Sequence, residues 1–290
     1  MQQYINCIAH VTSDGSLLIG NERAAMFDCG MLFCARDTIR NAEAALGGRP
    51  LDFLFATHTH YDHIGALPAL RERWPELKLV TSQVGAETLL KATPRRVIRE
   101  LSLAAAASFA SSLDPAGLAY DDGAFHADMI VKEGDCVDLG GCTVEGIETP
   151  GHTRDTLSYF IPELELLISS ESVGVLLNDG EVYPSYLTSY ADTVAAIEKC
   201  RRLPYKHLSV PHRGLIGDEQ AASYFEKAMR TAVSCHDMII AMHKNGSGDE
   251  EILERFHELY FNDAVAAVQP EVAFTINARA TIACTLRELG

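Results

Sequence analysis

Three histidines and one aspartate lie within six consecutive positions of the sequence. The segment reads HTHYDH and contains His58, His60, Asp62 and His63. Imidazole nitrogen and carboxylate oxygen are ligands that divalent metals such as zinc accept, and catalytic sites leave one position open for water. Because the chain has only 11 histidines in 290 residues, this spacing is unusual. The segment therefore predicts a metal site.

Three further candidate ligands occur later in the chain, each at or just after the end of a short apolar run. These residues are His152, Glu171 and His212. The HTHYDH segment also follows such a run, LDFLFAT. In open α/β sheets, ligand-binding residues gather where strands end. We therefore expect all of these side chains to meet at one rim of a sheet.

The apolar runs and turn residues predict an alternation of strands and helices. Strands are expected over residues 51–57, 77–82, 155–162, 164–170 and 206–212. Helices are expected over residues 35–46, 65–74 and 190–203, and the first of them is ended by Gly47 and Gly48. This alternation is typical of an α/β fold.

Two segments break the alternation because they are helical throughout. Residues 84–125 are rich in alanine, and Thr93 followed by Pro94 is expected to cap the start of a long helix there. We interpret this segment as a helical lid inserted into the α/β domain. Beyond residue 216 the pattern is helical again. The expected division is a catalytic domain over 1–216 and a C-terminal helical extension over 217–290.

These motifs together resemble the metallo-β-lactamase superfamily. HTHYDH matches its H-x-H-x-D-H signature, TPGHTRD its proline-glycine-histidine turn, and VPHRG its last histidine. The similarity in layout covers about residues 5 to 216. It implies a four-layer αββα sandwich, in which two mixed sheets are packed between outer helices.

The resemblance also implies a pair of divalent metal ions. Two ligand groups are expected: His58, His60 and His152 for one ion, and Asp62, His63 and His212 for the other. The family usually places an aspartate that bridges both ions where this chain has Glu171. Its extra methylene requires the backbone to retreat if the carboxylate is to bridge. Zinc is the expected metal, and iron or manganese would suit the same ligands.

The chemistry expected of such a pair is hydrolysis. Two cations lower the pKa of a shared water towards neutrality, which gives a nucleophilic hydroxide that attacks a carbonyl. Asp62 would act as the catalytic residue that orients this hydroxide and accepts its proton. Asp28 resembles an aspartate that orients ligands in many family members, although a simple turn former would look the same. Thr153 and Asp155 are candidate partners for His152.

The start of the lid helix is basic, which is unexpected in an acidic chain. Arg95 and Arg99 share one helix face at i, i+4 spacing. They would either form a solvated basic face or bind the anionic part of a substrate, such as the phosphates of coenzyme A, at the pocket mouth. His126, just after the lid, is a candidate pocket residue.

Composition narrows the class of partner. The formal net charge of −16 disfavours nucleic acid and anionic membranes as partners, because both attract clustered Lys and Arg. No signal-peptide pattern, membrane-length apolar run or C-x-x-C pair occurs in the sequence. We therefore expect a cytoplasmic protein with reduced thiols. The apolar segment ATIACTL could pack on its own lid or on a second copy, which leaves a homodimer open.

The expected substrate is a small-molecule acyl thioester linked to coenzyme A, glutathione or a carrier. The order of sandwich, helical insert and helical tail resembles the hydroxyacylglutathione hydrolases. A thiolate also leaves with little help from a general acid. Two alternatives stay open: a lactonase that uses the same attack, and a regulatory binding protein whose metal site is impaired by Glu171.

Overall fold

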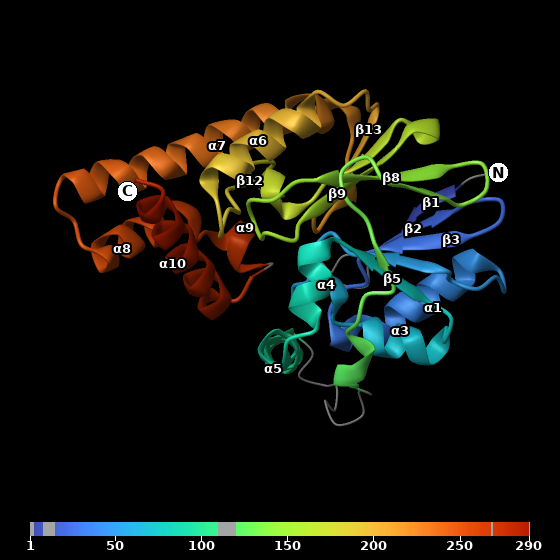
Figure 1. Ribbon diagram of the computed structural model, residues 1–290. Coiled ribbons are helices and arrows are strands. Elements are labelled where there is room, and N and C mark those ends of the chain that lie inside the picture. Colours follow the sequence, from blue (N-terminus) through green and yellow to red (C-terminus); the bar gives the residue numbers. More distant parts are fainter. Residues whose placement is uncertain (1–2, 8–14, 110–119, 268, 290) are drawn as a thin grey trace.

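The structure is a computed structural model and describes residues 3–7, 15–109, 120–267 and 269–289. Two six-stranded sheets form its framework, and helices cover the outer face of each sheet (Figure 1). The predicted αββα sandwich is therefore confirmed. The first sheet comes from the N-terminal part of the chain and the second from the middle part, so the segments predicted to carry ligands are divided between the two sheets.

The first sheet runs in sequence order from β1 to β6. Its strands are β1 (Gln3–Asn6), β2 (Ser16–Ile19), β3 (Ala24–Phe27), β4 (Phe53–Phe55), β5 (Lys78–Thr81) and β6 (Met129–Ile130). β1 to β3 are antiparallel, whereas β3 to β6 are parallel. Phe27 pairs with Phe55 at the ends of β3 and β4. The residues that follow these two strands are therefore neighbours.

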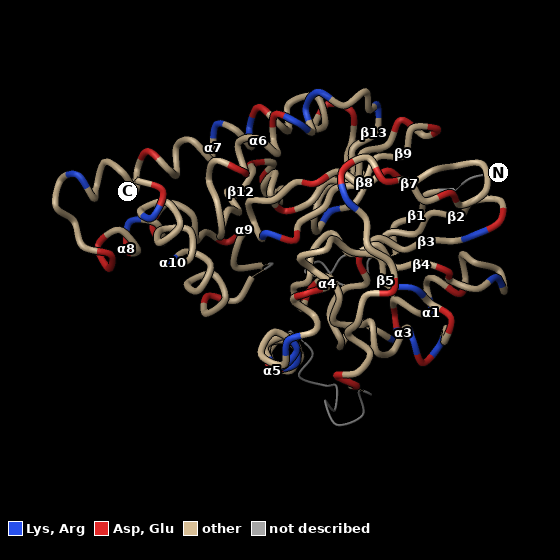
Figure 2. The backbone as a smooth tube through the Cα atoms, viewed as in Figure 1, with Lys and Arg blue, Asp and Glu red and all other residues tan. Residues whose placement is uncertain are grey.

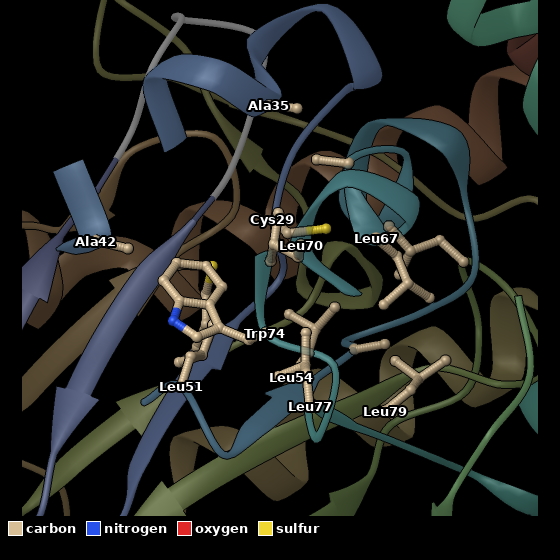
Figure 3. Close-up of a cluster of buried hydrophobic side chains, with 14 of the residues drawn as sticks. Cys29, Ala35, Ala42, Leu51, Leu54, Leu67, Leu70, Trp74, Leu77 and Leu79 are labelled. Carbon is tan, nitrogen blue, oxygen red and sulfur yellow. The ribbon is translucent and has the colours of Figure 1, made fainter. Parts of the chain in front are cut away.

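Helices that follow β3 and β4 cover the outer face of the first sheet. They are η1 (Leu32–Cys34), α1 (Ala35–Leu46), α2 (Tyr61–Ile64) and α3 (Leu67–Arg73). α1 has the predicted bounds and ends at Gly47, whose φ of 59° is the left-handed conformation that favours glycine. Trp74, Leu70 and Leu54 belong to the buried cluster that joins these helices to the sheet (Figure 3).

The second sheet has the strand order β14-β13-β10-β9-β8-β7. Its strands are β7 (Cys136–Asp138), β8 (Thr143–Glu148), β9 (Leu157–Ile161), β10 (Leu166–Ile168), β13 (His207–Val210) and β14 (Gly214–Leu215). Only the β10–β13 pair is parallel. Shorter elements join these strands: η4 (Pro162–Leu164), η5 (Glu171–Val173), β11 (Val175–Leu176) and β12 (Val182–Tyr183).

The two sheets meet through a layer of buried aromatic and aliphatic side chains. Phe27 and Phe55 of the first sheet both pack against Tyr159 of β9, with ring centroids 5.5 and 5.2 Å away. The Tyr159 hydroxyl donates a hydrogen bond of 2.6 Å to the carbonyl oxygen of Ala56. This bond fixes the end of β4 against the second sheet, directly before the HTHYDH segment.

The predicted lid segment contains two helices, α4 (Gln83–Leu89) and α5 (Ala92–Phe109), followed by η3 (Asp122–Ala124). Residues 110–119 of this segment lie outside the described part of the chain. The predicted cap at Thr93 is wrong, because α5 begins one residue earlier. Thr93 and Pro94 lie in its first turn, where a proline costs no helical hydrogen bond.

The described part of the second half of the chain contains five further helices. They are α6 (Tyr190–Arg201), α7 (Asp218–Lys244), α8 (Asp249–Tyr260), α9 (Asp263–Ala266) and α10 (Glu271–Arg287). α6 and the first half of α7 cover the outer face of the second sheet, and α8 to α10 pack against the second half of α7 (Figure 1). Among the described helices, none combines the length and apolar character of a membrane span.

Candidate metal centre

The HTHYDH segment lies at the end of β4 and forms a turn that continues into the one-turn helix α2. His58 is fully buried, and His60 is the residue that precedes α2. Asp62 and His63 lie on α2 itself. One short segment therefore delivers four candidate ligands to the same edge of the first sheet.

The second sheet contributes three more candidate ligands at strand ends. His152 follows β8 after Gly151, whose φ is 141° and where a Cβ atom would lie 2.8 Å from the backbone N and Cα of Thr193, so glycine is required. Glu171 opens η5 shortly after β10. His212 follows β13 with a φ of 59°, a conformation uncommon for a residue other than glycine. The structure thus brings the predicted ligands of both sheets together.

These side chains form two adjacent groups. The ligand atoms of each group all lie within 4.8 Å of one another: His58, His60 and His152 in the first, and Asp62, His63, Glu171 and His212 in the second. Their division follows the one that the family resemblance implies, with Glu171 added to the second group.

Ring nitrogens of the three histidines in the first group converge on one point. Nε2 of His152 lies 3.2 Å from Nδ1 of His60. Nε2 of His58 is buried and has no hydrogen-bond partner within the described protein. A buried polar atom without a partner is costly, and a cation placed among three imidazole nitrogens would remove that cost. The donor set therefore fits a divalent metal ion.

Glu171 lies between the two groups. Its Oε1 accepts hydrogen bonds from Nε2 of His63 at 3.0 Å and from Nε2 of His212 at 2.6 Å. Its Oε2 is 3.2 Å from Nε2 of His152, which belongs to the first group. The longer glutamate side chain therefore reaches both groups from its position on η5.

The charges of these groups suit cation binding. Burial and the neighbouring imidazoles hold the pKa of His58 well below its ordinary value, and burial lowers the pKa of His152 to about 4. Both rings are therefore neutral at pH 7, as metal ligands must be. Burial opposes ionisation of Glu171, but His152 and the hydrogen bonds from His212 and His63 hold its pKa well below the usual range. Burial opposes protonation of His63, but Asp62, Asp28 and the hydrogen bond to Glu171 hold its pKa well above the ordinary value. The centre thus holds a buried carboxylate beside two neutral imidazoles and one ring that must lose a proton when a metal binds.

Asp28 positions the ring of His63 in the second group. Its Oδ2 accepts a hydrogen bond of 2.9 Å from Nδ1 of His63, and both carboxylate oxygens accept hydrogen bonds of 2.7 Å from Thr57. The pairing of β3 with β4 places these residues side by side. Of the two interpretations left open by the sequence, the structure supports a residue that orients a ligand.

The partner of His152 differs from both residues that the sequence suggested. Nδ1 of His152 lies 3.0 Å from the carbonyl oxygen of Ser185 and also 3.0 Å from its hydroxyl, which in turn donates to Glu171. Asp155 instead accepts from the backbone N–H of Thr59, and Thr153 contacts Thr156. Sequence reasoning missed Ser185 because a single serine in the segment YPSYL carries no motif.

The three predicted substrate residues lie away from this centre. The Arg95 guanidinium donates to the carbonyl oxygen of Asp122, and Arg99 pairs with the Asp122 carboxylate at 3.2 Å. His126 is exposed, with Nδ1 2.8 Å from the carbonyl oxygen of Gly123. These residues join α5 and the segment after it to η3. The structure does not bring them into the cavity beside the ligands.

A cavity of about 550 Å³ adjoins the ligand groups. His60, Asp62, His152, Glu171 and His212 form one end of it. Its remaining walls come from α5, from α9 and α10, and from the segment around β11 and β12. In Figure 1, α10 lies opposite α4 and α5. The volume falls within the range of small-molecule sites, about 300–1,000 Å³.

Replacing Asp28 by asparagine is expected to weaken metal binding at the second group about 10- to 100-fold. Asparagine has one acceptor oxygen and an NH₂ donor, so it cannot accept from both His63 and the two donors of Thr57. Zinc affinity would be measured by competition with a chelator. Asp52→Asn is the matched control, because Asp52 accepts from the backbone N–H of Ala24 at another point of the same sheet, away from both ligand groups. Equal zinc affinity in the two variants would contradict this role for Asp28.

A sandwich of two sheets with paired His and carboxylate groups at the strand ends defines a metal-binding α/β protein of the metallo-hydrolase type. The family model described as the metallo-beta-lactamase superfamily matches residues 13–212, more than half of the chain. The chain belongs to this superfamily. The recognition made from HTHYDH, TPGHTRD and VPHRG is therefore confirmed.

The sequence identity to individual relatives is low. The chain is 29% identical over 129 residues to a hydroxyacylglutathione hydrolase of Ruegeria pomeroyi, in a match that covers 44% of this chain and 36% of that protein. It is also 29% identical over 167 residues to a coenzyme F420H(2) oxidase of Methanothermobacter marburgensis, in a match that covers 56% of this chain and 35% of that protein. The chain spans less than half the length of these relatives. Since one is a hydrolase and the other an oxidase, membership alone does not define the reaction.

A solved structure supports the fold over nearly the whole chain. It is a metallo-beta-lactamase family protein from Thermus thermophilus, which is 18% identical with a TM-score of 0.65, and the match covers 99% of this chain and 94% of that one. At this identity the likeness shows the fold alone. The match nevertheless includes the helices after the sandwich, not only the two sheets.

Proposed function

We propose that this chain binds two divalent metal ions and hydrolyses acyl thioesters. The ligand types favour zinc as the metal. One observation carries the proposal: two adjacent groups of metal ligands form one end of a cavity whose other walls are mainly apolar. This arrangement offers a reactive centre and a place for an acyl group in the same cavity. The match to a hydroxyacylglutathione hydrolase supports this choice of reaction.

Each predicted ligand has a role in this proposal. His58, His60 and His152 would hold the first ion, and Asp62, His63 and His212 would hold the second. Glu171 lies between the two groups. When bound, the metals supply a nucleophilic water at neutral pH and polarise the substrate carbonyl.

The chain's own residues complete the chemistry. Asp62 lines the cavity, with Oδ2 3.7 Å from Nε2 of His63, and accepts the proton of the attacking water. Ser185 and Asp28 orient His152 and His63 through their second ring nitrogens. A thiolate leaves with little help from a general acid, so the remaining cavity need only position the acyl group.

Metal analysis combined with a substrate panel tests the proposal. Protein purified without chelator is expected to contain close to two zinc ions and to hydrolyse thioesters of coenzyme A, glutathione or N-acetylcysteamine. Chelator should abolish turnover and added zinc should restore it. Turnover of lactones alone would replace the thioesterase with a lactonase. Protein without metal or turnover would instead support a binding role.

A further inference from the structure

We propose that the cavity selects a neutral, largely apolar acyl group, which it holds between α5 and α10; this inference rests on the proposed thioester hydrolysis. The metal ligands occupy one end of the cavity, so a scissile carbonyl placed there would direct its acyl group or its thiol carrier along the remaining walls. The chemistry of these walls decides which of the two fits.

Two apolar faces form the opposite walls. One face of α5 supplies Pro94, Val97, Ile98 and Leu101 at helical spacing, and α10 supplies Ala273, Ile276 and Ala280. Val97 is 40% exposed and Ile276 is 57% exposed. Large apolar side chains usually avoid such exposure when they share a concave surface, unless the surface receives an apolar ligand. The two faces therefore match a hydrocarbon or an aromatic group.

The charge of the lining excludes an anionic ligand from these walls. Among the described residues that line the cavity, the acidic side chains are Asp62, Asp155 and Glu171, and no Lys or Arg occurs. Figure 2 shows that α5 carries basic residues. Arg95 and Arg99 are not part of the lining and contact Asp122 instead. A carboxylate or phosphate placed against these walls would lose its hydration without gaining a cation. An anionic carrier must therefore remain outside them, and the acyl group must itself be neutral.

Small residues on α10 leave space for that group. Ala273 and Ala280 lie two turns apart on the cavity side of the helix, and both are partly exposed. A phenylalanine at position 280 would fill part of the space that the alanine leaves. Ala283 lies on the same helix, is exposed, and is not part of the lining. The pair Ala280→Phe and Ala283→Phe therefore applies the same substitution inside and outside the cavity.

A series of N-acetylcysteamine thioesters from acetyl to decanoyl tests this selection, because the carrier is neutral and constant. We expect kcat/KM to rise about fourfold per methylene until the cavity is filled. Butanoyl thioester should be hydrolysed at least about tenfold faster than its anionic counterpart, succinyl thioester. Equal rates along the series, or a preference for succinyl, would overturn the inference.

A binding measurement provides a second test that does not depend on turnover. S-octyl-N-acetylcysteamine, a thioether without a scissile carbonyl, should bind the protein as purified in a calorimetric titration. Ala280→Phe should weaken this binding about tenfold and shift the preferred acyl length downward, while Ala283→Phe should change neither. If the thioether binds in this way and no thioester is hydrolysed, the proposed function fails but the apolar site stands. If thioesters are hydrolysed and Ala280→Phe behaves like Ala283→Phe, the apolar site is wrong.

Discussion

Replacing His60 by alanine is expected to lower thioester hydrolysis about a thousandfold, equivalent to about 4 kcal/mol of transition-state stabilisation. The first ligand group has three imidazoles, and the substitution leaves only His58 and His152. His60 also lines the cavity, so its loss acts where the ion and the substrate meet. Zinc content should fall from close to two ions per chain to close to one.

The control for this experiment is His243→Ala. His243 is exposed near the end of α7, outside both ligand groups. Metal analysis and hydrolysis would be measured on both variants, together with thermal unfolding to show that the fold is retained. If His60→Ala kept both ions and the native rate, the first ligand group would not be the reactive centre.

The candidate metal centre could be predicted from the sequence mainly because its candidate ligands are close together in the chain. Four ligands lie within HTHYDH, so the turn after β4 and the single turn of α2 position them with little help from the rest of the chain. His152 and His212 required only the rule that ligands lie at strand ends. Their meeting with His58 follows from the packing of the two sheets, which the buried contact between Tyr159 and Phe55 holds together.

Contacts that depend on side-chain direction could not be predicted in the same way. Arg95 and Arg99 share a helix face as expected, but the sequence does not show which residue that face contacts. In the structure this residue is Asp122. Ser185 reaches His152 from a loop 33 positions away. Such partners are chosen by tertiary packing, because their local sequence is compatible with many neighbours.

Replacing Glu171 by glutamine is expected to reduce hydrolysis at least about a hundredfold and to lower zinc content to close to one ion per chain. Glutamine preserves the size of the side chain but removes the negative charge that faces His63, His212 and His152. The second ion depends on that charge, since without it Asp62 is the only carboxylate left in its ligand group. Glu165→Gln is the matched control, because Glu165 precedes β10 and pairs with Lys206 on the surface. Surface pairs contribute at most about 1 kcal/mol, so this control should retain metal and activity.

The substitution Glu171→Asp separates the effect of the negative charge from the effect of side-chain length. It keeps the carboxylate but shortens the side chain by one bond, about 1.5 Å. From its position on η5, an aspartate would withdraw from His63 and His212, which now lie 3.0 and 2.6 Å from Oε1. Zinc affinity and hydrolysis are therefore expected to fall between those of the native protein and Glu171→Gln. If Glu171→Asp bound both ions as tightly as the native protein, the length of the glutamate would not be matched to this centre. If instead it behaved like Glu171→Gln, the length of the side chain would matter as much as its charge, because the backbone at η5 would lie too far from the ligand groups for an aspartate to reach them.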